Sequence, residues 1–117
     1  MINRHAKAIW MLLALGLATE AEATIYNTDA STISTISTYT QYGGGDVIVF
    51  LANNSLSASC PYGFWIRATD PGAKTTIAQV LAAQAAGTSV RIWADTAVTW
   101  SGAGSAACAV WNIRTSQ

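Results

Sequence analysis

The stretch KTTIAQVLAAQAAGTSVRIWADT, residues 74–96, joins a helical pattern directly to a strand pattern and so decides the fold class. Its first part, residues 74–87, is rich in alanine and ends at Gly87, as expected of a helix closed by a glycine C-cap. We expect its apolar stripe to consist of Ile77, Val80, Leu81 and Ala85. We expect its opposite face to consist of Thr76, Gln79, Ala83 and Ala86. That face carries no glutamate or lysine, so it is either alanine-rich for helix propensity alone or packed against a neighbouring subunit.

The strand that follows, residues 88–95, presents different chemistry on its two faces, because successive side chains of a strand alternate. One face receives the apolar residues Val90, Ile92 and Ala94. The other receives a cation, a flat aromatic ring and a carboxylate in one row, namely Arg91, Trp93 and Asp95. A second aromatic and cation pair, Trp65 and Arg67, lies on an earlier expected strand.

These five polar and aromatic residues are the candidate contact site for a glycan or a partner. Sugars present an apolar C–H face that stacks on aromatic rings, and their hydroxyls pair with carboxylates and guanidinium groups. The structural alternative is that each tryptophan belongs to the core or to a subunit interface. In that case an arginine over a tryptophan is only a stabilising cation–π pair.

Strand and turn signals surround this unit in a regular order. Strands are expected within residues 24–42, 47–52, 62–69, 88–95 and 107–114, with a turn at GGGD, residues 43–46. The first of these segments contains a TIS repeat of period three, so we expect one or two irregular edge-like strands with a bulge. The expected class is mainly β with one helix, arranged as an OB-fold-like five-stranded Greek-key barrel in the order β-β-β-α-β-β. An open α+β sandwich has the same order of elements and is the alternative.

Residues 1–23 have the features of a secretory signal peptide, and residues 24–117 form a single domain. A positive start is followed by the apolar run at residues 8–18 and a small-residue cleavage pattern, AEA, at residues 21–23. An N-terminal membrane anchor is the alternative. Cys60 and Cys108 both lie after this segment, so we expect a disulfide in an exported protein, periplasmic or extracellular, rather than two buried thiols.

Few residues after position 23 are able to carry catalysis. The only histidine, His5, and both glutamates, Glu20 and Glu22, precede that point, so neither a Ser-His nor a Cys-His pair can form. A pair of aspartates is the remaining enzymatic alternative. We expect no enzymatic activity, no metal site and no cofactor. The formal net charge is zero, which argues against nucleic acid or an anionic membrane surface as a partner.

The segment IAQVLAAQAAGTSVRIWADTAVTW, residues 77–100, followed by Cys108, resembles the B subunits of pertussis-like and subtilase-type A–B toxins and related small exported bacterial proteins. The matching positions are Gly87, Val90, Arg91, Ile92, Trp93, Asp95, Trp100 and Cys108. CPYGFWI, residues 60–66, resembles the cysteine-containing strand of that group, so the likeness covers residues 60–114. It implies an OB-fold, a ring of five subunits with the helices lining a central pore, glycan recognition on host cells and a catalytic A subunit as partner.

Two hypotheses of different class follow. The first is a secreted or periplasmic non-enzymatic binding protein, similar to a toxin B subunit, that recognises a cell-surface glycan as a homopentamer. The alternative is a monomeric exported structural or inhibitor module that binds a protein partner. The first strands, TISTISTYTQY at residues 32–42, do not match the toxin group, so its sugar-binding residues cannot be transferred to this chain one by one.

Overall fold

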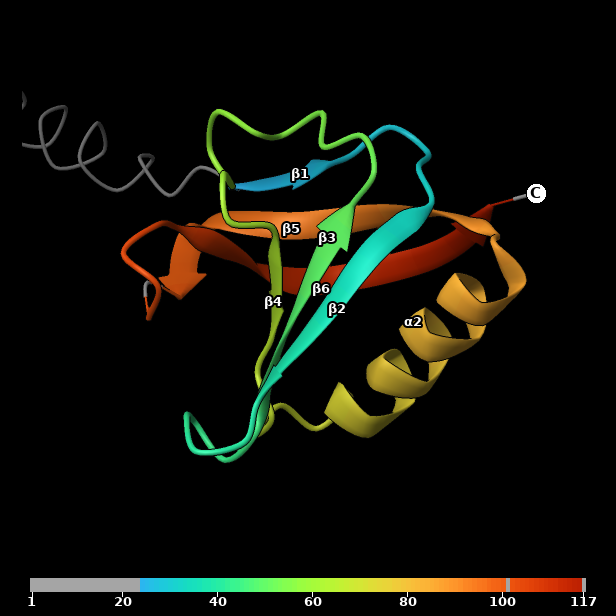
Figure 1. The fold of residues 1–117 in the computed structure, drawn as a ribbon. Coiled ribbons are helices and arrows are strands. Elements are labelled where there is room, and N and C mark those ends of the chain that lie inside the picture. The colour runs from blue at the N-terminus through green and yellow to red at the C-terminus, as the bar shows by residue number, and fades with distance from the viewer. Residues whose placement is uncertain (1–23, 101, 117) are drawn as a thin grey trace, which may run out of the picture.

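The computed structural model describes residues 24–100 and 102–116, which fold into six strands and one helix (Figure 1). The elements are β1 (Ile25–Asn27), β2 (Ile33–Tyr39), β3 (Asp46–Leu51), β4 (Phe64–Ile66), α2 (Ala73–Ala86), β5 (Ser89–Trp100) and β6 (Ala107–Ser116). The prediction of a mainly β chain with one helix is confirmed. The prediction of a five-stranded barrel is wrong in strand number and in closure, because the segment before residue 42 supplies two strands and the six strands form one open sheet.

The strand order in the sheet is β1-β5-β6-β4-β3-β2, and only the β4–β6 pair is parallel. The long strand β5 lies between β6 and β1, with Tyr26 opposite Ala94. Beyond β1 the chain stays beside β5, since the amide of Ser31 donates to the carbonyl of Val90 (3.0 Å) and the amide of Val90 donates back (2.8 Å). The sheet therefore curls until the start of β2 touches the start of β5 through this single bridge.

A bulge in β2 explains the period of three in its sequence. Ile33 pairs with Leu51 and Thr35 with Phe50, so Ser34 is an extra residue that shifts the alternation of side chains. As a result Ile33 is buried and Ile36, three positions later, also packs against the core. The expectation of an irregular, bulged strand is confirmed.

Both faces of strand β3 are covered. One face packs toward α2 in the main core, which includes Val47, Val49, Phe64, Val80, Val90 and Ile92. The other face carries a second cluster, in which Ile48 and Trp100 pack with tyrosines and Trp65. This burial from two sides accounts for the unbroken apolar run at residues 47–51, because a strand with one solvated face would alternate with polar residues.

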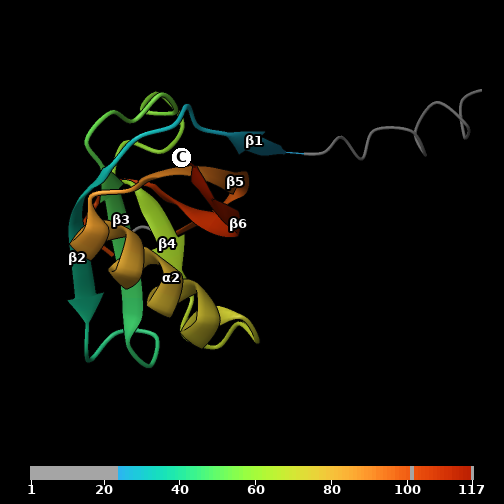
Figure 2. The same ribbon diagram turned by 90° about the vertical axis from the view of Figure 1, so that its right-hand side faces the viewer.

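Helix α2 lies across one face of the sheet (Figure 2). The side of the helix that faces the sheet differs in part from the expected apolar stripe. Its buried residues are Ala73, Val80 and Ala83, whereas Leu81 is 50% exposed and Ala85 is exposed. Ala83 was expected on the outer face. The side-chain Nε2 of Gln79 donates to the carbonyl of Ile113 on β6 (3.2 Å), so this polar side chain points toward the sheet. The C-terminal prediction is confirmed, since Gly87 has a φ of 66° and caps the helix.

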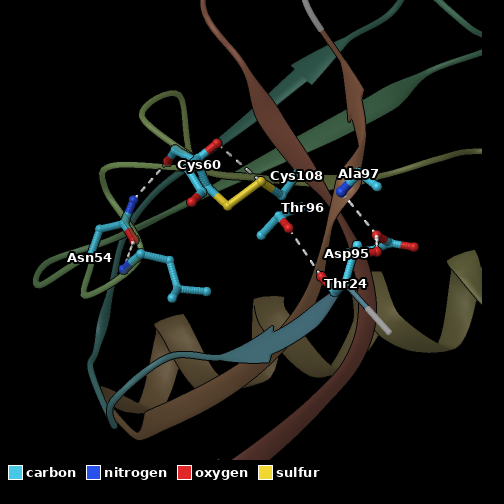
Figure 3. The surroundings of a disulfide bond; sticks show 9 residues. Thr24, Asn54, Cys60, Asp95, Thr96, Ala97 and Cys108 are labelled. Carbon is cyan, nitrogen blue, oxygen red and sulfur yellow. Dashed lines mark hydrogen bonds between the residues drawn. A yellow bond between two sulfur atoms is a disulfide. The ribbon is translucent and has the colours of Figure 1, made fainter. Parts of the chain in front are cut away.

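Cys60 and Cys108 form a disulfide, as predicted, with both residues fully buried (Figure 3). The bond fits a protein of an oxidising compartment, which is where such bridges persist. The predicted signal peptide at residues 1–23 lies outside the described residues. Within the described residues, no helix has the length and apolar character needed to cross a membrane.

Candidate functional site

The candidate row on β5 occupies the outer face of the sheet, opposite the main core. Val90, Ile92 and Ala94 are fully buried, while Arg91, Trp93 and Asp95 are only partly buried. The predicted alternation is therefore confirmed along this strand. Because paired residues of neighbouring strands share a face, the flanking strands also add side chains to this row.

Strand β6 supplies the residue that holds Trp93, and the sequence analysis missed it. Arg114 pairs directly with Arg91, and its guanidinium carbon lies 4.4 Å from the centroid of the Trp93 ring. Asn112 lies opposite Trp93 on the same strand. The cation–π partner of Trp93 is thus Arg114 and not Arg91, whose own guanidinium is 3.4 Å from the carbonyl of Thr28. We call Arg91, Trp93 and Arg114 the arginine–tryptophan row.

The row places two positive charges side by side. Like charges directly opposite each other on paired strands destabilise a sheet. Within residues 24–100 and 102–116 a single ion pair is present, and it joins Arg67 to Asp70. No carboxylate of the described chain is therefore paired with Arg91 or Arg114. The two arginines together have ten guanidinium N–H donors, five each. One of these donors, on Arg91, contacts the Thr28 carbonyl.

Asp95 continues the row, but one of its oxygens is already used within the fold. The hydroxyl of Thr24 and the amide of Ala97 (3.0 Å) both donate to its Oδ1 (Figure 3). The hydrogen bond from Thr24, and then that from Ala97, lower the pKa of the Asp95 carboxyl below its ordinary value of 3.8. Asp95 therefore stays charged at neutral pH and fastens the start of β1 to β5.

Trp65 and Arg67 lie on the same outer face but not beside the arginine–tryptophan row. Trp65 and Asp95 both pair with Ala109 of β6, so one strand separates them, or about 10 Å at the usual strand spacing. Arg67 stacks on Trp65 at 4.6 Å and forms an ion pair with Asp70 at 3.9 Å. Trp65 also packs against the second cluster, so this pair is tied into the fold at both ends.

The chemistry available in the row is recognition by stacking and hydrogen bonding. In the described part of the chain no three histidine, cysteine, aspartate or glutamate residues gather as a metal site. Comparison with protein-family models, curated proteins and solved structures gave no match.

Proposed function

We propose that the protein is an exported non-enzymatic glycan-binding domain of OB-fold type, similar to toxin B subunits. The strand order supports the fold class. Without β1, the order is β2-β3-β4-β6-β5, with the last strand inserted beside the third and the helix between the third and fourth, as in a partly open Greek-key barrel. The bridge between Ser31 and Val90 brings the two ends of this order together.

The arginine–tryptophan row is the observation that carries the ligand proposal. A partly exposed ring of Trp93 offers a stacking platform for the C–H face of a sugar. Arg91 and Arg114 provide donors for hydroxyls, and their two charges lack carboxylate partners in the described chain. A glycan that bears a carboxylate or sulfate group would supply the missing negative charge through charge-assisted hydrogen bonds.

Removing one arginine tests this proposal on a glycan array. Arg114→Gln should weaken binding of acidic glycans about tenfold or more, since a hydrogen bond to a charged group is worth about 1.5–3 kcal/mol. Trp93→Ala should weaken binding of the same glycans. Lys74→Gln removes an equal charge from the exposed start of α2 and should change nothing. If the wild-type protein retains no acidic glycan, or if all three variants bind alike, the row is not a glycan site.

We also propose that copies of the chain associate through the outer face of α2. This face exposes Ala78, Leu81, Ala82 and Ala85, and its one charged residue is Lys74, a turn before Ala78. Small apolar residues let helices approach closely, so a second copy of the same helix is a fitting occupant.

Light scattering after size exclusion measures this association. A mass of several chains, about five for a ring of the kind the toxin resemblance implies, is the expected result. Leu81→Lys should reduce that mass, whereas Thr40→Lys in the β2–β3 hairpin adds the same charge elsewhere and should not. A wild-type monomer would contradict the association and favour the monomeric module that binds a protein partner.

A further inference from the structure

A second candidate site is a cavity in the surface beside the start of α2, and its chemistry differs from that of the arginine–tryptophan row. A cavity of about 360 Å³ opens between the residues that precede the helix and strands β4 and β6. Its apolar lining includes Ile66, Ala73 and Val110, and its polar lining includes Asp70 and Thr76. The volume is within the range of about 300–1,000 Å³ that ligand pockets span, at its lower end.

Trp111 borders this cavity and is unusually exposed. Its exposed fraction of 69% is the highest among the large apolar side chains that reach the surface of the described chain. On β6, Asn112 pairs with Trp93 and Val110 pairs with Ala94, so Trp111 is the extra residue of a bulge. Bulges redirect a side chain and are frequent beside functional sites. The bulge here leaves a large aromatic ring in solvent at the mouth of a cavity.

The polar groups of the cavity limit the kind of ligand it accepts. Asp70 is its one charged residue, which disfavours an anion. Asp70 already forms an ion pair with Arg67 at 3.9 Å, which offsets its negative charge. A cationic ligand is therefore not needed to balance the charge of the cavity. The hydroxyl of Thr76 donates to the carbonyl of Gly72 (2.9 Å) and keeps its oxygen available as an acceptor. A neutral ligand with several hydroxyl donors and one apolar face fits this combination.

We infer that the cavity binds an uncharged monosaccharide residue, which stacks on Trp111 and donates hydroxyl hydrogen bonds to Asp70. This site is separate from the arginine–tryptophan row, and its chemistry differs because the row carries two cations and the cavity none. The inference stands on the residues of the cavity and does not require that the row bind a glycan.

Titration followed by NMR tests the inference through the indole N–H signals of the tryptophans. The probes are methyl α-mannopyranoside, methyl β-galactopyranoside and methyl β-glucopyranoside, each added to the disulfide-bonded protein. At least one should shift the Trp111 signal saturably and leave the Trp93 signal in place. Trp111→Ala and Asp70→Asn should each weaken that binding about tenfold, judged from backbone amides around the cavity.

Trp93→Ala and Arg114→Gln are the matched controls and should leave the binding of these probes unchanged. Failure of the acidic glycans on the array would therefore not alter this result, and the two proposals fail separately. The inference is overturned if none of the three glycosides shifts Trp111. It is also overturned if tetramethylammonium shifts Trp111 and the glycosides do not, because the cavity would then be a cation site.

Discussion

Replacing Trp100 with alanine should lower the free energy of unfolding by about 3–5 kcal/mol, the usual loss for a large aromatic residue removed from a core. Trp100 is only 5% exposed and forms the centre of the second cluster. The rings of Tyr39, Tyr42 and Tyr62 surround it, with centroids 4.8, 5.8 and 6.0 Å from its own. Urea denaturation followed by far-UV circular dichroism measures the change.

Trp93→Ala is the matched control for this experiment, because it removes the same side chain from the outer face. Trp93 is only partly buried, and its ring makes a cation–π contact with Arg114. Removing the Trp93 side chain should therefore lower the free energy of unfolding much less. The two variants together separate structural from functional tryptophans. If Trp93→Ala destabilises the protein as much as Trp100→Ala, Trp93 is a core residue and the proposed glycan site is wrong.

Reduction of the disulfide is the second change with a large expected effect. Cys60 and Cys108 are 48 positions apart, and the chain-entropy treatment gives about 4 kcal/mol for a loop of that length. A domain of this size has a total stability of about 5–15 kcal/mol, so the loss is a large fraction of it. Thermal melting with and without a thiol-free reductant should show a fall in Tm of roughly 15–30 °C.

The double variant Cys60→Ala with Cys108→Ala separates the two contributions of the bridge. Both residues are fully buried in the main core, so the variant loses apolar contacts as well as the covalent link. It should melt at or below the temperature of the reduced wild-type protein. Equal melting temperatures for the oxidised and reduced wild-type protein would show that the bond adds nothing to stability.

The features that follow from local alternation were predictable from the sequence. The inward and outward residues of β5, the bulge in β2 and the glycine cap at Gly87 each depend on a few neighbouring positions. The disulfide was predictable because two cysteines allow one pairing. The stripe of α2 was not, since a helix with alanines on every side has no apolar face for periodicity to reveal.

The partners within the site depend on register, which local patterns do not fix. Arg114 meets Trp93 because β6 pairs with β5 in one register, and a bulge at Trp111 then changes that register further along. Alternation around Ile113 does place Arg114 on an outer face, so that signal was present in the sequence. The burial of Trp100 was not predictable from its neighbours in sequence, because most of the cluster that buries it comes from β2, β3 and β4, far away in the chain.

The contacts that fasten β1 to β5 also determine when the fold is able to form. Thr24 meets Asp95 and Thr96 across 71 and 72 positions of sequence, and Thr28 meets Ile92 across 64. Contacts of such high sequence separation slow folding, because the entropy of closing a long loop is lost before the contacts are gained. The first strand therefore has no partner until most of the chain has been synthesised. The β2–β3 hairpin, by contrast, is complete by residue 51, so a nascent chain is able to form this local part of the sheet long before it is able to attach its first strand.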